Sequence, residues 1–143
     1  MTKKKILFLI PFLLVAGFLL DCWTTILTSD FFALLRHYIG LLLFVVVTVV
    51  FFKDFTKAVV GLGVYLLLAT FNGLAITPTI KTSSFFIGEL STPYIQPLSL
   101  GLLVLYFVLN LKNLIDIQLR YKEAKERKAK HRLVDAANTG LPK

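Results

Sequence analysis

Four long apolar stretches occupy most of the chain, and polar connections separate them. Each of the first three stretches holds close to the roughly 20 residues that a helix needs to cross about 30 Å of hydrocarbon. The fourth stretch is shorter, and it reaches this length when its polar flanks lie among the lipid headgroups. The pattern therefore predicts four transmembrane helices, at about residues 6–27, 33–52, 57–78 and 94–113.

The connections between these segments set their arrangement. The first two connections are short, so neighbouring helices must run antiparallel and side by side. Asp54 lies in the second connection and is a candidate N-cap for the third helix. The third connection, residues 78–96, is a longer outer loop, either functional or a simple cover over the bundle. We predict an all-α fold for residues 1–118: a polytopic integral membrane protein with an antiparallel bundle of four helices.

Composition and charge add an orientation. Hydrophobic residues make up 57% of the chain, and its mean hydropathy is +0.78. With the N-terminus in the cytoplasm, the inner side receives fourteen of the sixteen basic residues, and only Arg36 and Lys81 lie outside. Basic residues are enriched in cytoplasmic segments, so we predict that both termini lie inside. The short basic N-terminus and the compact hairpins favour a bacterial cytoplasmic (inner) membrane as the location of this multi-pass protein.

The first residues also imitate an export signal. Lys3–Lys5 precede an apolar run, and Cys22 stands where the cysteine of a lipoprotein would stand. The residue before it is Asp21, which is neither small nor neutral, and the apolar run continues beyond the cysteine. We therefore expect an uncleaved first helix. A single cysteine also excludes an intrachain disulfide and a cysteine-based metal cluster.

Residues 119–143 are polar but suited to a helix, and we predict a basic cytoplasmic helical tail there. Between residues 120 and 132 the tail has two glutamates and seven basic residues, a net charge of +5. Such a tail contacts anionic lipid headgroups or an acidic partner, or only anchors the topology. Nucleic acid is not an expected partner, because no aromatic residues alternate with these charges. The basic residues are Arg120, Lys122, Lys125, Arg127, Lys128, Lys130 and Arg132.

Small and polar residues share single stripes of the predicted helices. Residues three or four apart lie on one helix face, and polar atoms facing lipid would lack hydrogen-bond partners. We therefore expect these stripes to face other helices. The predicted helix-packing seam consists of Gly17, Thr24, Gly61, Tyr65, Tyr106 and Asn110.

A polar layer is predicted in the outer half of the membrane. At a rise of 1.5 Å per residue, Asp21 and Asn72 both lie roughly 22 Å from the inner edge. Arg36, His37 and Ser99 fall at nearly the same level, within the first turns of the inward-running helices. Two interpretations remain open. The layer is a structural clasp in which Asp21 pairs with Arg36, or it is a site for a small ion, a proton or a polar ligand.

No catalytic constellation accompanies this layer. The sequence has no paired carboxylates in the spans, no phosphate-binding loop and no histidine pair at ligand spacing, so we expect no enzyme activity, cofactor or metal. The predicted function is that of a small membrane protein acting through protein–protein interaction, as an accessory, regulatory or immunity-type subunit of a larger membrane partner. The alternative is a small transporter or channel, active as a homo-oligomer, that uses the polar layer.

Overall fold

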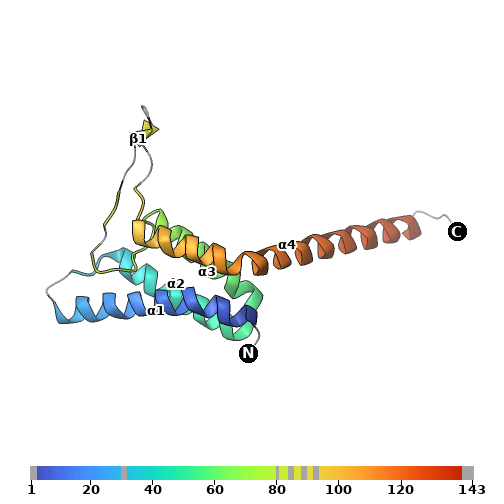
Figure 1. Ribbon diagram of the computed structural model, residues 1–143. Helices are drawn as coiled ribbons and strands as arrows, with labels where there is room; N and C mark the ends of the chain where they lie inside the picture. The colour runs from blue at the N-terminus through green and yellow to red at the C-terminus, as the bar shows by residue number, and fades with distance from the viewer. Residues whose placement is uncertain are drawn as a thin grey trace. The chain divides into compact units, whose positions relative to one another are not determined.

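The computed structural model describes residues 3–29, 32–79, 81–83, 86–87, 90–91 and 94–139. Within these residues the protein is all-α apart from two very short strands (Figure 1). Three of its helices, α1, α2 and α4, are long and apolar enough to cross a membrane, whereas α3 is apolar but shorter. The elements are α1 Lys3–Thr28, α2 Leu35–Lys53, α3 Phe55–Thr70, β1 Phe86–Ile87, β2 Leu90–Ser91 and α4 Pro97–Thr139.

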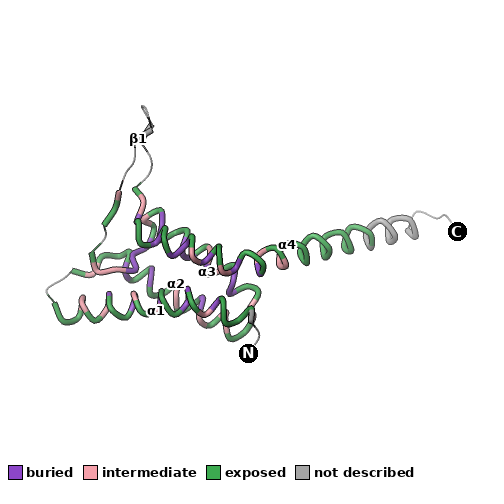
Figure 2. The backbone as a smooth tube through the Cα atoms, viewed as in Figure 1, coloured by how far each residue is buried: buried purple, intermediate pink, exposed green. Residues whose placement is uncertain are grey.

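The chain forms two compact units, residues 1–111 and 112–143. The sequence places the boundary between the membrane domain and the tail after residue 118, and this boundary stays a prediction. In the first unit the buried residues lie on one face of α1, on α3, on the chain that follows α3 and on the first half of α4, with fewer on α2 (Figure 2). In the second unit α4 continues as a helix through the basic segment, and every residue from Gln118 to Lys130 is exposed.

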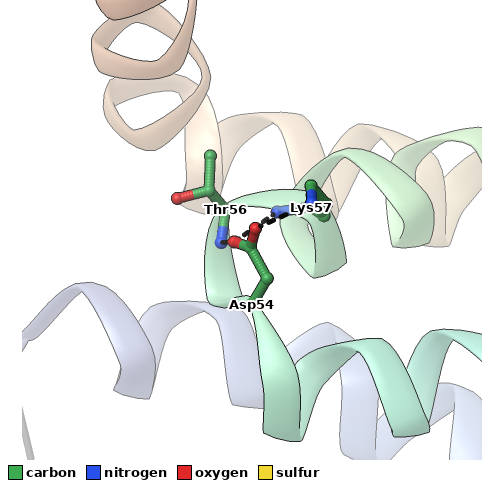
Figure 3. A network of polar contacts seen from close by, with 3 residues as sticks. All are labelled: Asp54, Thr56 and Lys57. Carbon is green, nitrogen blue, oxygen red and sulfur yellow. Dashed lines mark hydrogen bonds and ion pairs between the residues drawn. The ribbon is translucent and has the colours of Figure 1, made fainter.

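One residue, Asp54, separates α2 from α3 (Figure 3). Its backbone N–H donates to the Val50 carbonyl of α2 at 2.7 Å. Its Oδ1 accepts from the backbone N–H groups of Thr56 and Lys57 at 3.0 and 3.2 Å, and Lys57 Nζ lies 3.4 Å from Oδ2. These bonds satisfy donors that a helix N-terminus leaves unpaired. The predicted N-cap is therefore confirmed.

Phenylalanines join the start of α1 to the α2–α3 turn. The Phe8 ring centroid lies 5.5 Å from that of Phe51 and 5.4 Å from that of Phe55. Further along α1, Phe12 stacks on Phe44 of α2 at 5.0 Å. Aromatic pairs at these separations add to the energy of burial. The contacts place the N-terminal end of α1 beside the α2–α3 turn and make α1 antiparallel to α2.

The first half of α4 packs on α3 through one tyrosine. The Tyr106 side chain is fully buried, and its hydroxyl donates to the Val59 carbonyl near the start of α3. Gly63 makes room for the ring, because a Cβ there would lie 3.1 Å from Tyr106 Cε1. At the other end of α3, the Gln96 backbone N–H donates to the Thr70 carbonyl at 3.0 Å. The two contacts make α4 antiparallel to α3.

The helix predicted for the third span is too long at its C-terminal end, because α3 ends at Thr70 and not at residue 78. Asn72 has φ 61°, in the left-handed region, and the Gly73 N–H donates to the Leu68 carbonyl at 2.8 Å. Asparagine followed by glycine is suited to this reversal, since both tolerate left-handed backbone. We call residues 71–79 the return segment. Its centre, Leu74–Ile76, is fully buried although it is not helical.

The predicted outer loop contains a short antiparallel pair. Strand β1 pairs with β2 in the register Phe86 to Ser91 and Ile87 to Leu90. Ser83 and Ile95 form a further bridge at the base of this pair. α4 begins at Pro97 and not at residue 94, as expected for a proline, whose fixed φ suits the first position of a helix.

Candidate binding site around the return segment

The return segment is held to α2 by His37. This side chain is only 2% exposed, and its Nδ1 accepts from the Leu34 backbone N–H at 3.0 Å. Its Nε2 lies 3.1 Å from the Thr77 carbonyl oxygen. Because Nδ1 faces a donor, the neutral tautomer with the proton on Nε2 satisfies both contacts. His37 thus caps the start of α2 and fixes the far end of the return segment.

Gln96 holds the near end of the segment from the start of α4. Its side chain is 4% exposed, and Nε2 donates to Asn72 Oδ1 at 3.0 Å and to the Leu74 carbonyl at 3.1 Å. Its Oε1 accepts from the Ser99 hydroxyl at 3.1 Å. Buried polar backbone requires such partners, and at membrane depth a non-helical segment persists only where protein encloses it.

Backbone contact with α2 completes the attachment. The Ala75 N–H donates to the Arg36 carbonyl at 3.1 Å. A Cβ built on Gly40 would lie 2.6 Å from the Ala75 carbonyl oxygen, so no larger residue fits there without a shift. The return segment therefore lies directly on the first turns of α2.

The structure joins the side chains of three residues of the predicted polar layer to the hydrogen bonds of this segment and leaves the other two side chains outside them. His37, Asn72 and Ser99 all belong to its hydrogen-bond network. Asp21 and Arg36 are both exposed, and no ion pair joins them in the part of the chain that the structure describes. The clasp expected between these two side chains is thus not formed.

Asp21 instead lines a cavity beside the return segment. The cavity has a volume of about 400 Å³ and is lined by Thr77–Thr79, Gln96–Leu98, Asp21 and Lys81. Asp21 also borders an apolar groove of about 290 Å³ on α1, formed with Leu13, Leu14, Gly17 and Phe18. A carboxylate, an ammonium group, hydroxyls and an apolar groove thus meet in one place, which suits an amphiphilic ligand.

Some residues of the predicted helix-packing seam lie between helices, and others are exposed. Tyr65, Tyr106 and Asn110 are buried, and a Cβ on Gly61 would be in ordinary contact with Val47 of α2. Gly17 and Thr24 are exposed. α1 packs through a different face, because large apolar side chains bury more area than small ones. That face carries Phe8, Phe12, Val15, Leu19 and Cys22.

The basic tail residues lie on exposed helix. Arg132 belongs to the helix, but its side chain lies outside the described residues. Within the described chain, no three His, Cys, Asp or Glu side chains gather as metal ligands would. The exposed basic side chains are Arg120, Lys122, Lys125, Arg127, Lys128 and Lys130.

Of the residues that line the cavity, the sequence predicts only Asp21; Gln96 and Lys81 are the most important of those that it does not predict. The signal for Gln96 is a polar residue directly before the proline that begins a helix. Its partners lie 22 and 24 positions earlier, so no local pattern reveals them. Lys81 was counted only as an outer charge.

Comparisons with known proteins add no family to this picture. No family model matches the chain, and neither a curated protein nor a solved structure is significantly similar to it.

Proposed function

We propose that the chain crosses a bacterial cytoplasmic membrane four times, with both termini inside. The contacts of Phe8 with the α2–α3 turn bring the basic residues near the start of α1 to the same end as Lys53 and Lys57. Basic residues therefore gather at one end of these helices, and this enrichment supports placing that end in the cytoplasm. α3 alone is about 24 Å long, and the buried return segment extends its path toward the outer side.

Single-cysteine labelling tests this topology. In a Cys22→Ala background, cysteines replace Lys53, Thr79 and Lys125, which are all exposed. A membrane-impermeant maleimide applied to intact cells should label the Thr79→Cys variant alone. Lys53→Cys and Lys125→Cys should react only after permeabilisation. Labelling of Lys53→Cys and Thr79→Cys from the same side would show that α3 does not cross.

We propose that the protein is non-enzymatic and acts by binding an acidic region of a larger membrane protein at the cytoplasmic surface. The observation that carries this proposal is the exposed helix from Gln118 to Lys130, which has six basic and two acidic residues and no buried face. Its large apolar residues, Leu119 and Tyr121, are exposed like the others, so this stretch packs into no hydrophobic core within the described chain. The i,i+4 pairs Glu123 with Arg127 and Glu126 with Lys130 support such a helix in water.

Native mass spectrometry of the tagged protein in nanodiscs tests the partner. We expect a hetero-complex of fixed stoichiometry, lost when Lys122, Lys125 and Lys128 are all replaced by Gln. The matched control replaces Glu123 and Glu126 by Gln on the same helix, which raises the net positive charge and should keep the complex. A wild-type protein that is stable and free of any partner would overturn the proposal.

A specific observation favours a second candidate, a transporter or channel active as a homo-oligomer. The exposed Asp21 carboxylate lines the cavity beside the hydrogen bonds made by the buried His37 and Gln96 and the half-buried Asn72. An ionisable residue within a span is a functional candidate. Under this function Asp21→Asn abolishes flux in proteoliposomes and leaves unfolding unchanged within about 0.5 kcal/mol, since no ion pair is lost. A loss of about 1–3 kcal/mol of stability in the same variant would instead assign Asp21 a structural role.

A further inference from the structure

The cavity beside the return segment and the groove on α1 share one residue, Asp21. Most of the cavity lining is apolar, but it carries two charged side chains, Asp21 and Lys81, and the hydroxyl-bearing residues Thr77 and Thr79. The groove runs along α1 from Leu13 to Asp21, about 12 Å of helix. One site therefore offers two opposite charges for a headgroup and an apolar groove for a chain.

The two charged side chains of the cavity indicate which headgroup would fit there. Neither Asp21 nor Lys81 forms an ion pair with any residue that the structure describes. A ligand with one ammonium and one phosphate gives each of them a partner of opposite charge through a charge-assisted hydrogen bond. A purely anionic headgroup would leave the carboxylate without a partner. The cavity volume of about 400 Å³ lies within the range of small-molecule sites.

The lining also decides between two zwitterionic headgroups. Quaternary ammonium groups are held by aromatic cages, and no aromatic ring lines this cavity in the described part of the chain. A primary ammonium donates hydrogen bonds to a carboxylate, which a trimethylated one cannot do. The carboxylate of Asp21 therefore selects a primary amine.

The groove accounts for the apolar part of the ligand. Gly17 forms part of its wall, and a Cβ built there meets nothing within 4 Å. The neighbouring Leu13 and Leu14 are exposed and supply an apolar surface. Because α1 faces lipid hydrocarbon there, an acyl chain lying in this shallow groove gains close van der Waals contact with the helix and not burial from water.

We propose that this site binds one phospholipid with a phosphoethanolamine headgroup. The ammonium lies at Asp21, the phosphate at Lys81, and one acyl chain in the groove beside Gly17. This inference goes beyond the proposed partner binding, which uses the tail, and it does not depend on transport. Its failure is therefore distinguishable from the failure of either function.

Native mass spectrometry of the full chain in detergent tests the proposal. The probes are phosphatidylethanolamine, phosphatidylcholine and phosphatidylglycerol with identical acyl chains, and soluble phosphoethanolamine without chains. We expect one bound phosphatidylethanolamine in preference to the other lipids. Asp21→Asn should reduce this preference over phosphatidylcholine roughly tenfold, the loss expected for one charge-assisted hydrogen bond. Asp21→Glu keeps a carboxylate and should retain the preference.

Two further variants separate the headgroup contacts from the groove. Lys81→Gln should weaken binding of all three lipids, because each has a phosphate. Gly17→Leu should fill the groove and weaken lipid binding, whereas Gly101→Leu, at an α4 position equally free of close neighbours, should not. Equal binding of the three lipids, or unchanged selectivity in Asp21→Asn, would overturn the proposal. Soluble phosphoethanolamine binding as tightly as the lipid would rule out a lipid as the ligand.

Discussion

At the scale of single residues, the most consequential polar groups are those that allow a non-helical segment to be buried. Gln96 satisfies two acceptors of the return segment, and His37 reaches a third. Each contact replaces a hydrogen bond to water that the buried segment cannot make. The segment therefore depends on side chains contributed by two different helices.

Replacing Gln96 by Leu should destabilise the protein strongly. The variant removes the donor to the half-buried Asn72 Oδ1 and to the buried Leu74 carbonyl, and a buried acceptor left unpaired costs about 1–3 kcal/mol. The measurement is the free energy of unfolding in mixed micelles. Gln118→Leu is the matched control, because Gln118 is exposed and should change stability by less than about 0.5 kcal/mol. Equal effects of the two variants would remove Gln96 from its structural role.

Gly40 is the second residue on which the segment depends. Gly40→Ala places a Cβ 2.6 Å from the Ala75 carbonyl oxygen, and backbone cannot move aside as a flexible side chain can. We expect a loss of about 1–3 kcal/mol, as for other overpacked sites. Gly101→Ala meets no atom within 4 Å and serves as the control. The same unfolding measurement should show little change for this control, and a stable Gly40→Ala variant would contradict the close approach.

At the scale of elements, the sequence pattern predicts the apolar helices well and their ends unevenly. Asp54 was identified as a cap because capping is local, involving residues two and three positions away. The end of α3 was missed because residues 71–78 are apolar enough to continue a span. The reversal at Asn72 is stabilised by a hydrogen bond from Gln96, which lies 24 positions later in the chain. Hydropathy carries no information on such contacts.

The capping carboxylate gives the α2–α3 turn a pH dependence. The hydrogen bond from the Lys57 backbone N–H is the main cause that lowers the pKa of Asp54 below its ordinary value, and the ammonium of Lys57 adds to it. A lowered folded-state pKa means that this stabilisation is fully present above the ordinary pKa of about 4. It is then lost as the pH falls through the lowered value.

Unfolding midpoints measured between pH 7 and pH 3 test this element. The difference between wild type and Asp54→Ala should be constant above about pH 5 and shrink toward pH 3. Asp54→Ser is the matched control, because serine caps a helix without titrating in this range. The difference between Asp54→Ser and Asp54→Ala should therefore not depend on pH. A difference between wild type and Asp54→Ala that persists at pH 3 would show that the carboxylate charge is not what stabilises the cap.

At the scale of the whole molecule, the fold class could be predicted from the sequence better than the residues of the candidate site. The all-α class and three membrane-length helices follow from apolar segment lengths, which the structure confirms. The polar layer was only partly predictable, because equal depth in the membrane does not imply contact. Asp21 and Arg36 were placed at one level, yet they form no ion pair within the described chain, while Gln96 holds the network together.

The uneven distribution of basic residues predicts how the molecule is oriented in the membrane. Replacing Lys3–Lys5 by Gln leaves eleven basic residues inside against two outside, so the orientation should not change. Neutralising the nine basic residues from Lys112 onward instead leaves five against two, still favouring the same orientation. Only the combined variant, with two on each side, loses the bias, and we expect it to insert in both orientations. The readout is maleimide labelling of Thr79→Cys in a Cys22→Ala background, which should be complete in both single sets and partial in the combined variant. Mixed orientation after neutralising Lys3–Lys5 alone would mean that the first helix, and not the total charge, orients the chain.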